Sequence, residues 1–260
     1  QYQEQTPEPP STEQNKTTFT KQISGSDIAE YKNANVEKTP GSYTFTKDSV
    51  LNYKGFGGAV ADGGIPLAID AANHTLTITV SNDGNMFIDG IHATAAKNID
   101  ITADKFIMNI NGDKDLSLNK AYGIWKQGES TTTIHGLTEI NAAAASSSYG
   151  VYASGYGSKI QLDGLKAAVN RDASDGLSIK SDGRGGSKIS VNVKDGVTGD
   201  HEVQLNGNIY TGVDGETNLA LTTQESLLNG VSIVQTETGS DDDDNPVTEA
   251  GTLNLYLQNG

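Results

Sequence analysis

Aromatic side chains with a polar atom lie close to a recurring Gly-aliphatic pair. Trp125 and Tyr152 each follow such a pair directly, Tyr122 comes just before the first pair, and Tyr156 comes shortly after the second. Rings that combine apolar area with a hydrogen-bonding atom are common at contact surfaces. They also pack on the outside of repeat proteins without binding anything. We therefore predict Trp125, Tyr152 and Tyr156 as candidate binding residues, with structural packing as the alternative.

An acidic run near the C-terminal end of the sequence is the one candidate for metal binding. It consists of Asp241, Asp242, Asp243 and Asp244. Hard cations such as Ca²⁺ bind carboxylate oxygens, but four adjacent aspartates cannot all reach one ion unless the loop folds around it. We expect a solvated loop here, with cation binding as the alternative, and we predict no cofactor.

The sequence nominates no catalytic nucleophile. It contains no cysteine and no Gly-x-Ser-x-Gly elbow, and the four histidines lie far apart, at His74, His92, His135 and His201. A polysaccharide lyase or hydrolase would instead need carboxylates that converge on one face. Its candidates are Asp163, Asp182 and Asp195. Because basic partners are few, we predict that the protein is not an enzyme and keep this activity as the alternative.

Charge and composition exclude several classes of partner. The net charge of −15 argues against nucleic acid and against anionic membrane surfaces, which both need clustered Lys and Arg. No apolar run approaches the ~20 residues of a membrane-spanning helix, so we expect no membrane insertion. Hydrophobic residues make up 35% of the chain, which suits an elongated fold with a thin core.

The elements that must position these residues repeat along the chain. The sequence Gly-Ser-Lys-Ile begins at Gly157 and again at Gly186. Alternating strands recur every ~30 residues, a period typical of solenoids. Their first residues are Leu76, Ile99, Ile134, Ile160, Ile189, Leu219 and Leu253. Gly-aliphatic pairs fall between them, at Gly90, Gly123, Gly150, Gly176, Gly207 and Gly230. No proline occurs between Pro66 and Pro246, as continuous ladders on both sides of every strand require.

These patterns predict an all-β fold, a right-handed parallel β-helix with three faces of stacked strands and an irregular N-terminal cap. We expect a disordered tail at 1–16, a capping region at 17–67 and β-helix rungs at 68–260. Ile160 and Ile189 should stack in neighbouring rungs, buried together with Leu162 and Val191. Gln161 and Ser190 should face the solvent.

The motifs Gly123-Ile-Trp, Gly150-Val-Tyr-Ala-Ser-Gly and Gly-Ser-Lys-Ile resemble those of bacterial autotransporter passenger domains, the large β-helical surface adhesins of Gram-negative bacteria. The resemblance covers residues 68–260. It implies a stalk carried across the outer membrane to the bacterial cell surface, and it implies that this chain is a fragment of a longer passenger.

The expected function is accordingly adhesion between cells or between a cell and its host, in aggregation or biofilm. The expected partners are a host or bacterial surface glycoprotein or glycan, or a second copy of the chain paired through ladders of Asn, Thr and Asp. The alternatives are the polysaccharide-cleaving enzyme and a structural stalk that binds nothing.

Overall fold

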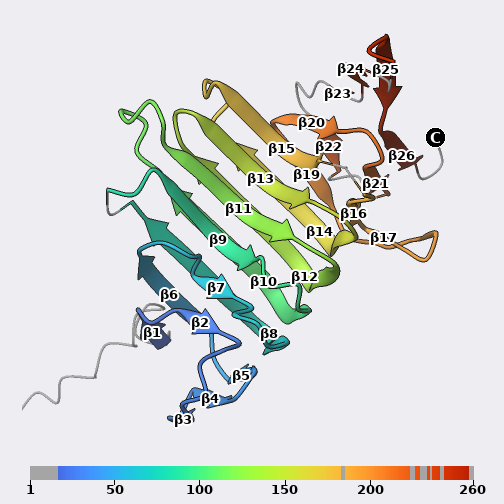
Figure 1. Cartoon of the computed structure of the whole chain (residues 1–260). Helices are drawn as coiled ribbons and strands as arrows, with labels where there is room; N and C mark the ends of the chain where they lie inside the picture. Colours follow the sequence, from blue (N-terminus) through green and yellow to red (C-terminus); the bar gives the residue numbers. More distant parts are fainter. Residues whose placement is uncertain are drawn as a thin grey trace, which may run out of the picture.

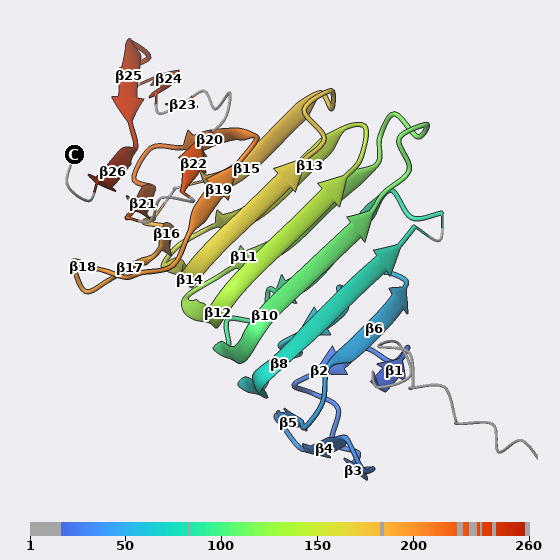
Figure 2. The ribbon, with the colours of Figure 1, turned by 180° about the vertical axis from the view of Figure 1, so that it is seen from behind.

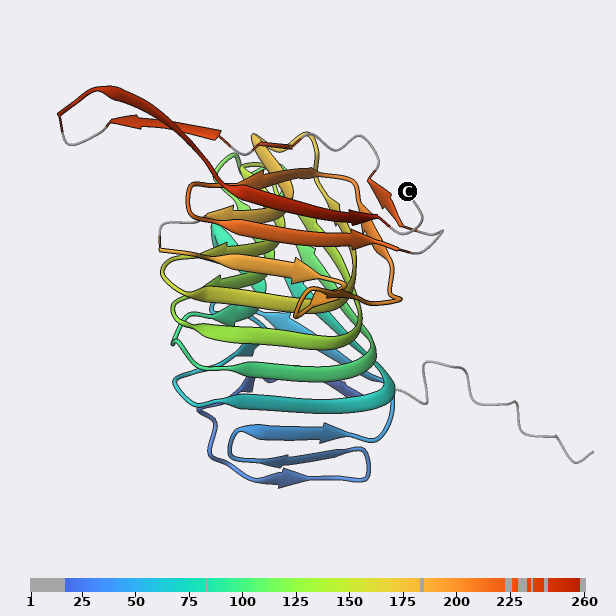
Figure 3. The same ribbon diagram turned by 90° about the vertical axis from the view of Figure 1, so that its right-hand side faces the viewer.

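A computed structural model of the chain describes residues 17–82, 84–182, 185–222, 226–228, 233–234, 236–240 and 243–257. Every regular element in these ranges is a strand, and the strands form a right-handed parallel β-helix of about seven turns, as the sequence predicts. Figure 3 shows the rungs stacked along one axis. The expected tail at 1–16 lies outside the described residues.

Two parallel sheets form the wall of the β-helix, and the larger one bends so that each turn has three faces (Figures 1 and 2). The long strands of the larger sheet are β8 (Leu67–Ser81), β10 (Ile99–Asn111), β12 (Ser130–Ala143) and β14 (Ser158–Val169). Their first halves continue into β16 (Lys188–Val191), β21 (Glu216–Leu221) and β26 (Thr252–Leu257) and form the first face. Their second halves continue into β19 (Val203–Leu205) and β22 (Leu227–Leu228) and form the second face.

The smaller sheet is the third face. In order along the axis its strands are β2 (Ile23–Ser24), β7 (Val60–Ala61), β9 (Phe87–Ala93), β11 (Lys120–Gln127), β13 (Ser147–Ser154), β15 (Asp175–Asp182), β20 (Asn208–Thr211) and β23 (Ile233–Val234).

A corner in each long strand separates the first face from the second. The register of β10 against β12 shifts between Thr102 and Lys105, and glycine occupies the bend of β12 at Gly136, whose φ is +97°. A Cβ on Gly136 would lie 1.8 Å from the carbonyl oxygen of Ala103 in the rung below. Only glycine fits this approach, so the corner depends on that residue type.

The parallel pairing begins before residue 68. The expected capping region already contains a turn of the β-helix, formed by β5 (Ser42–Phe45), β6 (Ser49–Lys54) and β7, which pair in parallel with β8 and β9. Below it, β1 (Thr17–Phe19) pairs in parallel with β6. The antiparallel part of the cap is β3 (Tyr31–Lys32), β4 (Val36–Thr39) and β5. On the third face Val60 pairs with Ile91 but follows Ala59 where Ile91 follows glycine, so the repeat pattern does not reveal these turns.

The axial core is built from inward columns of aliphatic residues. Ile160 pairs with Ile189, and Leu162 pairs with Val191, in the parallel register predicted. Ile160 and Ile189 are 1% and 0% exposed. This stack confirms the predicted alternation of inward and outward residues in these strands.

Three details of the predicted repeat are wrong. Leu76 pairs with Phe106 on the second face, whereas the first-face partner of Ile99 is Leu67. The first predicted repeat spacing, from Leu76 to Ile99, therefore joins residues on two different faces. On the third face Val151 pairs with Ile179 instead of Leu177, so the pair at Gly176 is out of register with its neighbours.

The third error concerns Ser190, which faces outward as predicted but is buried. It accepts a hydrogen bond from Asn218 Nδ2 at 3.1 Å and lies on the floor of a groove. One wall of that groove is a hairpin of β17 (Val193–Lys194) and β18 (Val197–Thr198). Gln161 is only partly exposed, and its amide donates to the carbonyl of Val193 in the same hairpin.

A lysine occupies the core at one end of the third face. Lys126 pairs with Ala93 below and Ala153 above and is fully buried. Its Nζ donates to the carbonyl oxygens of Gln127 and Gly128 at 3.0 and 2.9 Å. The small neighbours leave room for the long side chain, and burial lowers the pKa of Lys126 to about 8.

Substitution Ile189→Asp should lower the free energy of unfolding by several kcal/mol, because an unpaired charge would enter the dry axial core. Lys105→Asp, at an exposed outward position, is the control and should change it by less than about 0.5 kcal/mol. Thermal and urea melts of the two variants measure the difference. Equal losses would contradict the assignment of inward and outward positions.

Substitution Lys126→Met should raise the free energy of unfolding by about 1–2 kcal/mol at pH 7, because the folded wild type must bury a charge there. Between about pH 8 and the ordinary lysine pKa of 10.5, the unfolded chain keeps the proton that folded Lys126 has lost. Wild-type stability relative to Lys126→Met should therefore rise with pH across this window. Urea melts at pH 7 and pH 10 test it, and a pH-independent difference would show that Lys126 does not titrate there.

Candidate functional site

Aromatic side chains form two columns on the outer side of the third face. Register pairs Tyr122 with Tyr149 in one column, and it pairs Trp125 with Tyr152 in the other. Phe87 flanks the start of the columns, and Tyr210 continues the second beyond Lys180. We call these six rings the aromatic ladder. Figure 1 shows the strands that carry it, β9 to β20, side by side.

The Gly-aliphatic pair explains why two ring positions per strand face outward. The pairing of β11 with β13 passes from Tyr122–Tyr149 to Ile124–Val151 and leaves out Gly123 and its neighbour Gly150. Tyr122 and Trp125, three residues apart, therefore both face outward while Ile124 faces the core. A Cβ on Gly123 would lie 2.5 Å from the carbonyl oxygen of Gly150 and 2.5 Å from Ile140 Cγ2, so glycine is required.

The column of Tyr122 and Tyr149, which we call the inner column, is buried. The column of Trp125 and Tyr152, the outer column, is partly exposed. Tyr122 and Tyr149 stack with their ring centroids 4.8 Å apart and 5° between the ring planes, and both are buried. Trp125 and Tyr152 pack edge-on against these rings and stay partly exposed. Burial raises the pKa of Tyr122 to about 12 and also raises the pKa values of Tyr149 and Tyr152. The rings are therefore neutral phenols over the physiological range.

Charged groups lie among the ladder rings towards β20. Lys180 Nζ lies 5.0, 5.2 and 5.5 Å from the ring centroids of Tyr149, Tyr152 and Tyr210. Cation–π attraction of this kind holds an amine in place. The hydroxyl of Tyr149 donates to Asp175, and that of Tyr152 donates to Asp182 at 3.4 Å.

The opposite end of the ladder has polar atoms without partners. His92 Nδ1 lies 2.5 Å from Asp89 Oδ2, and burial raises the pKa of Asp89. Within the described part of the chain, Asp89 Oδ1 and Trp125 Nε1 have no hydrogen-bond partner. Buried polar atoms normally have hydrogen-bond partners, so these two atoms mark the end of the ladder where hydrogen-bonding capacity is left unused.

The structure brings two of the three predicted binding residues together. Trp125 and Tyr152 are neighbours in the ladder, but Tyr156 stands apart in the turn before β14, 69% exposed and next to Gly185. Sequence reasoning missed the other members, Phe87, Tyr149 and Tyr210, together with Lys180. For Tyr149 the missed signal is the aromatic residue just before a Gly-aliphatic pair, as in Tyr149-Gly-Val-Tyr152; Phe87 and Tyr210 lack this signal.

The described part of the acidic run, Asp243 and Asp244, lies just before β25 (Pro246–Ala250), which forms an antiparallel hairpin with β24 (Thr236–Ser240). Asp243 and Asp244 are exposed, while Asp241 and Asp242 lie outside the described residues. Over the described ranges, no group of three or more His, Asp or Glu residues is arranged to hold a metal ion.

The candidate acids of the enzyme alternative lie on different faces. Asp182 belongs to the third face, beside Tyr152. Asp163 lies at the corner between the first and second faces, where it accepts a hydrogen bond from the Gly136 amide at 3.0 Å. Asp195 belongs to the β17–β18 hairpin and lines the groove. Asp163 and Asp195 nevertheless line one pocket of about 310 Å³ beside that hairpin, together with Lys194 and His201, whereas Asp182 lies outside it.

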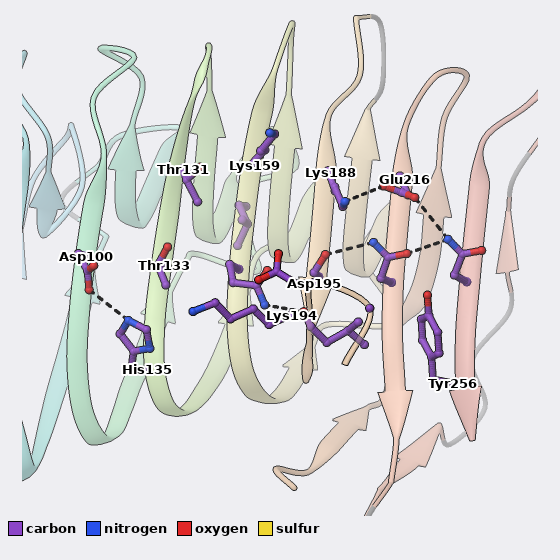
Figure 4. Close-up of a pocket in the computed structure, with 17 residues that line it drawn as sticks. Asp100, Thr131, Thr133, His135, Lys159, Lys188, Lys194, Asp195, Glu216 and Tyr256 are labelled. Atoms are coloured by element: carbon purple, nitrogen blue, oxygen red, sulfur yellow. Dashed lines mark hydrogen bonds and ion pairs between the residues drawn. The ribbon is translucent and has the colours of Figure 1, made fainter. Parts of the chain in front are cut away.

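A groove of about 500 Å³ crosses the outer side of the first face. We call it the first-face groove (Figure 4). Its floor consists of two in-register columns of polar residues. One column is Thr131, Lys159, Lys188 and Glu216; the other is Asp100, Thr133, Gln161, Ser190, Asn218 and Asn254. The hairpin residues Val193, Lys194 and Asp195 form a wall.

Some groove residues are paired and others are free. Figure 4 shows Lys188 bonded to Glu216, at 3.3 Å, and Asp100 bonded to His135, at 3.4 Å. Asn218 bridges Ser190 and Asn254 through hydrogen bonds of 3.1 and 2.8 Å. In the part of the chain that the structure describes, Lys159 and Lys194 form no ion pair.

Substitution Gly123→Ala should lower the free energy of unfolding by more than about 2 kcal/mol, because the methyl group would overlap the next rung. It should also shift the fluorescence of Trp125, the one tryptophan of the sequence, by moving the indole out of the ladder. Fluorescence spectra and melts measure both effects. Unchanged emission and stability would show that the close approach at Gly123 is not required.

No family model, curated protein or solved structure matches this chain. Among the described residues there is no helix of the length and apolarity needed to cross a bilayer. The functional argument therefore rests on the geometry of the aromatic ladder and of the first-face groove.

Proposed function

We propose that the protein is an adhesive rod, a cell-surface adhesin passenger that binds glycans of a neighbouring cell or of a host. The observation that carries this proposal is the aromatic ladder, with Trp125 and Tyr152 partly exposed in register on an uninterrupted β-sheet. The motif resemblance to autotransporter passengers supports location at the surface of a Gram-negative bacterium.

A glycan suits the ladder better than a purely apolar partner does. Pyranose rings have apolar C–H faces that stack on aromatic rings, and their hydroxyl groups need hydrogen-bond partners at the edges. The ladder supplies both, because Asp182 and Lys180 lie beside Tyr152 and the Asp89–His92 pair lies beside Trp125. Rungs are ~4.8 Å apart, and each strand places one residue in the partly exposed outer column. This regular spacing suits an extended polymer.

Binding without catalysis is the mechanism we propose. Each stacked ring contributes only a modest free energy, so a single rod binds weakly and many rods on one surface bind strongly. Side-by-side pairing of two rods remains the route to homotypic adhesion, because the net charge of −15 is screened beyond ~8 Å at physiological ionic strength.

Substitutions Trp125→Ala and Tyr152→Ala should each reduce glycan-dependent adhesion about three- to tenfold, since an aromatic stacking contact contributes about 0.5–1.5 kcal/mol. Tyr156→Ala is the matched control, because it removes an exposed ring outside the ladder. Beads that display the full chain are scored for binding to cells and to glycan arrays.

Three outcomes of this experiment would replace the proposal. Wild-type beads that adhere no better than bare beads would support the structural stalk. An equal loss with Tyr156→Ala would remove the ladder as the contact surface. Release of new sugar ends from a polysaccharide by the soluble chain would support the enzyme.

A further inference from the structure

The first-face groove is a second concave polar surface, separate from the aromatic ladder. Its floor presents one outward residue per strand in each column, over six strands from β10 to β26 in the longer column and over four strands from β12 to β21 in the shorter. Strands in a sheet are ~4.8 Å apart, so the longer column extends over roughly 24 Å along the axis. A groove of this shape accommodates an extended chain that lies across the rungs.

The chemistry of the floor indicates what kind of chain it accommodates. Thr133, Gln161 and Asn218 place hydroxyl and amide groups along one column of the floor. Such groups donate and accept hydrogen bonds, as a polymer rich in hydroxyl groups requires. Tyr256 is the one aromatic residue among the described lining residues, so ring stacking contributes little in this groove.

The charges add a preference for anions. The described lining contains three lysines, Lys159, Lys188 and Lys194, against three carboxylates, Asp100, Asp195 and Glu216, in a chain whose net charge is −15. Lys188 is paired with Glu216, and Asp100 is paired with His135. Lys159 and Lys194 are exposed and have no ion pair among the described residues. Asp195 likewise forms no ion pair among the described residues, so the groove offers two available cations against one available carboxylate within a strongly acidic molecule.

We propose that the first-face groove binds an acidic oligosaccharide, with Lys159 and Lys194 contacting its anionic groups and the floor columns contacting its hydroxyl groups. A polymer with one charge per sugar and many hydroxyls fits this mixed lining. A nucleic acid does not, because its closely spaced phosphates would meet Asp195 and Glu216 as well as the lysines. The anionic group is a carboxylate or a sulfate, and the two share this recognition chemistry.

The test measures Kd by calorimetry for the full chain with three ligands of equal length: an oligogalacturonate, a sulfated oligosaccharide and a neutral galacto-oligosaccharide. We expect at least one acidic ligand to bind at least about tenfold more tightly than the neutral one. The tighter acidic ligand identifies the source of the anionic group. Trp125 emission should stay unchanged during this titration, because the tryptophan lies on the third face; this separates groove binding from ladder binding.

Variants assign the binding to the two lysines. Lys159→Gln and Lys194→Gln should each raise the Kd of the acidic ligand about fivefold. Lys159→Arg keeps the charge and should keep the affinity. Lys54→Gln is the matched control, since it removes an exposed lysine on the second face that forms no ion pair among the described residues.

Several results would overturn the proposal. They are the absence of binding by either acidic ligand, equal affinity for the neutral ligand, and a loss with Lys54→Gln as large as that with Lys159→Gln. Unaltered affinity in the Lys159→Gln and Lys194→Gln variants would do the same. A failure of Trp125→Ala to reduce adhesion would leave this result unaffected, because the ladder and the groove lie on different faces.

Discussion

Parallel pairing of each rung with the next is the constraint on which the rest of the structure depends. In a parallel ladder every strand donates and accepts hydrogen bonds on both sides, so neighbouring rungs must keep the same register. Register copies the inward or outward direction of a residue from rung to rung. In the core, register stacks Ile160 and Ile189 in neighbouring rungs. On the surface, it stacks Trp125 and Tyr152. The core and the candidate binding surfaces thus have one physical origin.

Glycine lets this stack depart from strict alternation where the surface needs it. At Gly123 the backbone approaches the next rung so closely that no side chain fits, and the pairing skips that residue. Two outward positions then lie three residues apart, and each strand contributes two side chains to the third face. Lys126 shows a different departure, since a titratable amine fills a core position between Ala93 and Ala153. Its burial opposes folding at neutral pH, which the remaining aliphatic columns must offset.

Much of the fold could be predicted from local pattern, but the identity of each face could not. Alternation and the absence of proline indicate stacked strands, and they place Ile160 and Ile189 correctly. The pattern alone cannot tell a first-face strand from a second-face strand, because both alternate in the same way; Leu76 was assigned to the wrong face for this reason. Ser190 faces outward as its strand requires, yet the hairpin at Val193–Thr198, which follows directly in the sequence, lines the same groove and helps to bury it. The ladder was found only in part, because Phe87 and Tyr210 gain their neighbours from register rather than from sequence proximity.

The three-faced cross-section also separates chemically different surfaces. A rung turns a sharp corner between faces, so the aromatic ladder and the first-face groove share a backbone but no outward side chains. Stacking rings need a flat sheet whose outer column is partly open, and the third face supplies that. A groove needs a wall, and the hairpin after β16 supplies one only on the first face. Because each rung contacts chiefly its neighbours, an insertion such as this hairpin changes one face locally without disturbing the register of the others. A solenoid can therefore acquire a second binding surface by adding a wall to one face, while the columns that define the first surface are kept by the core.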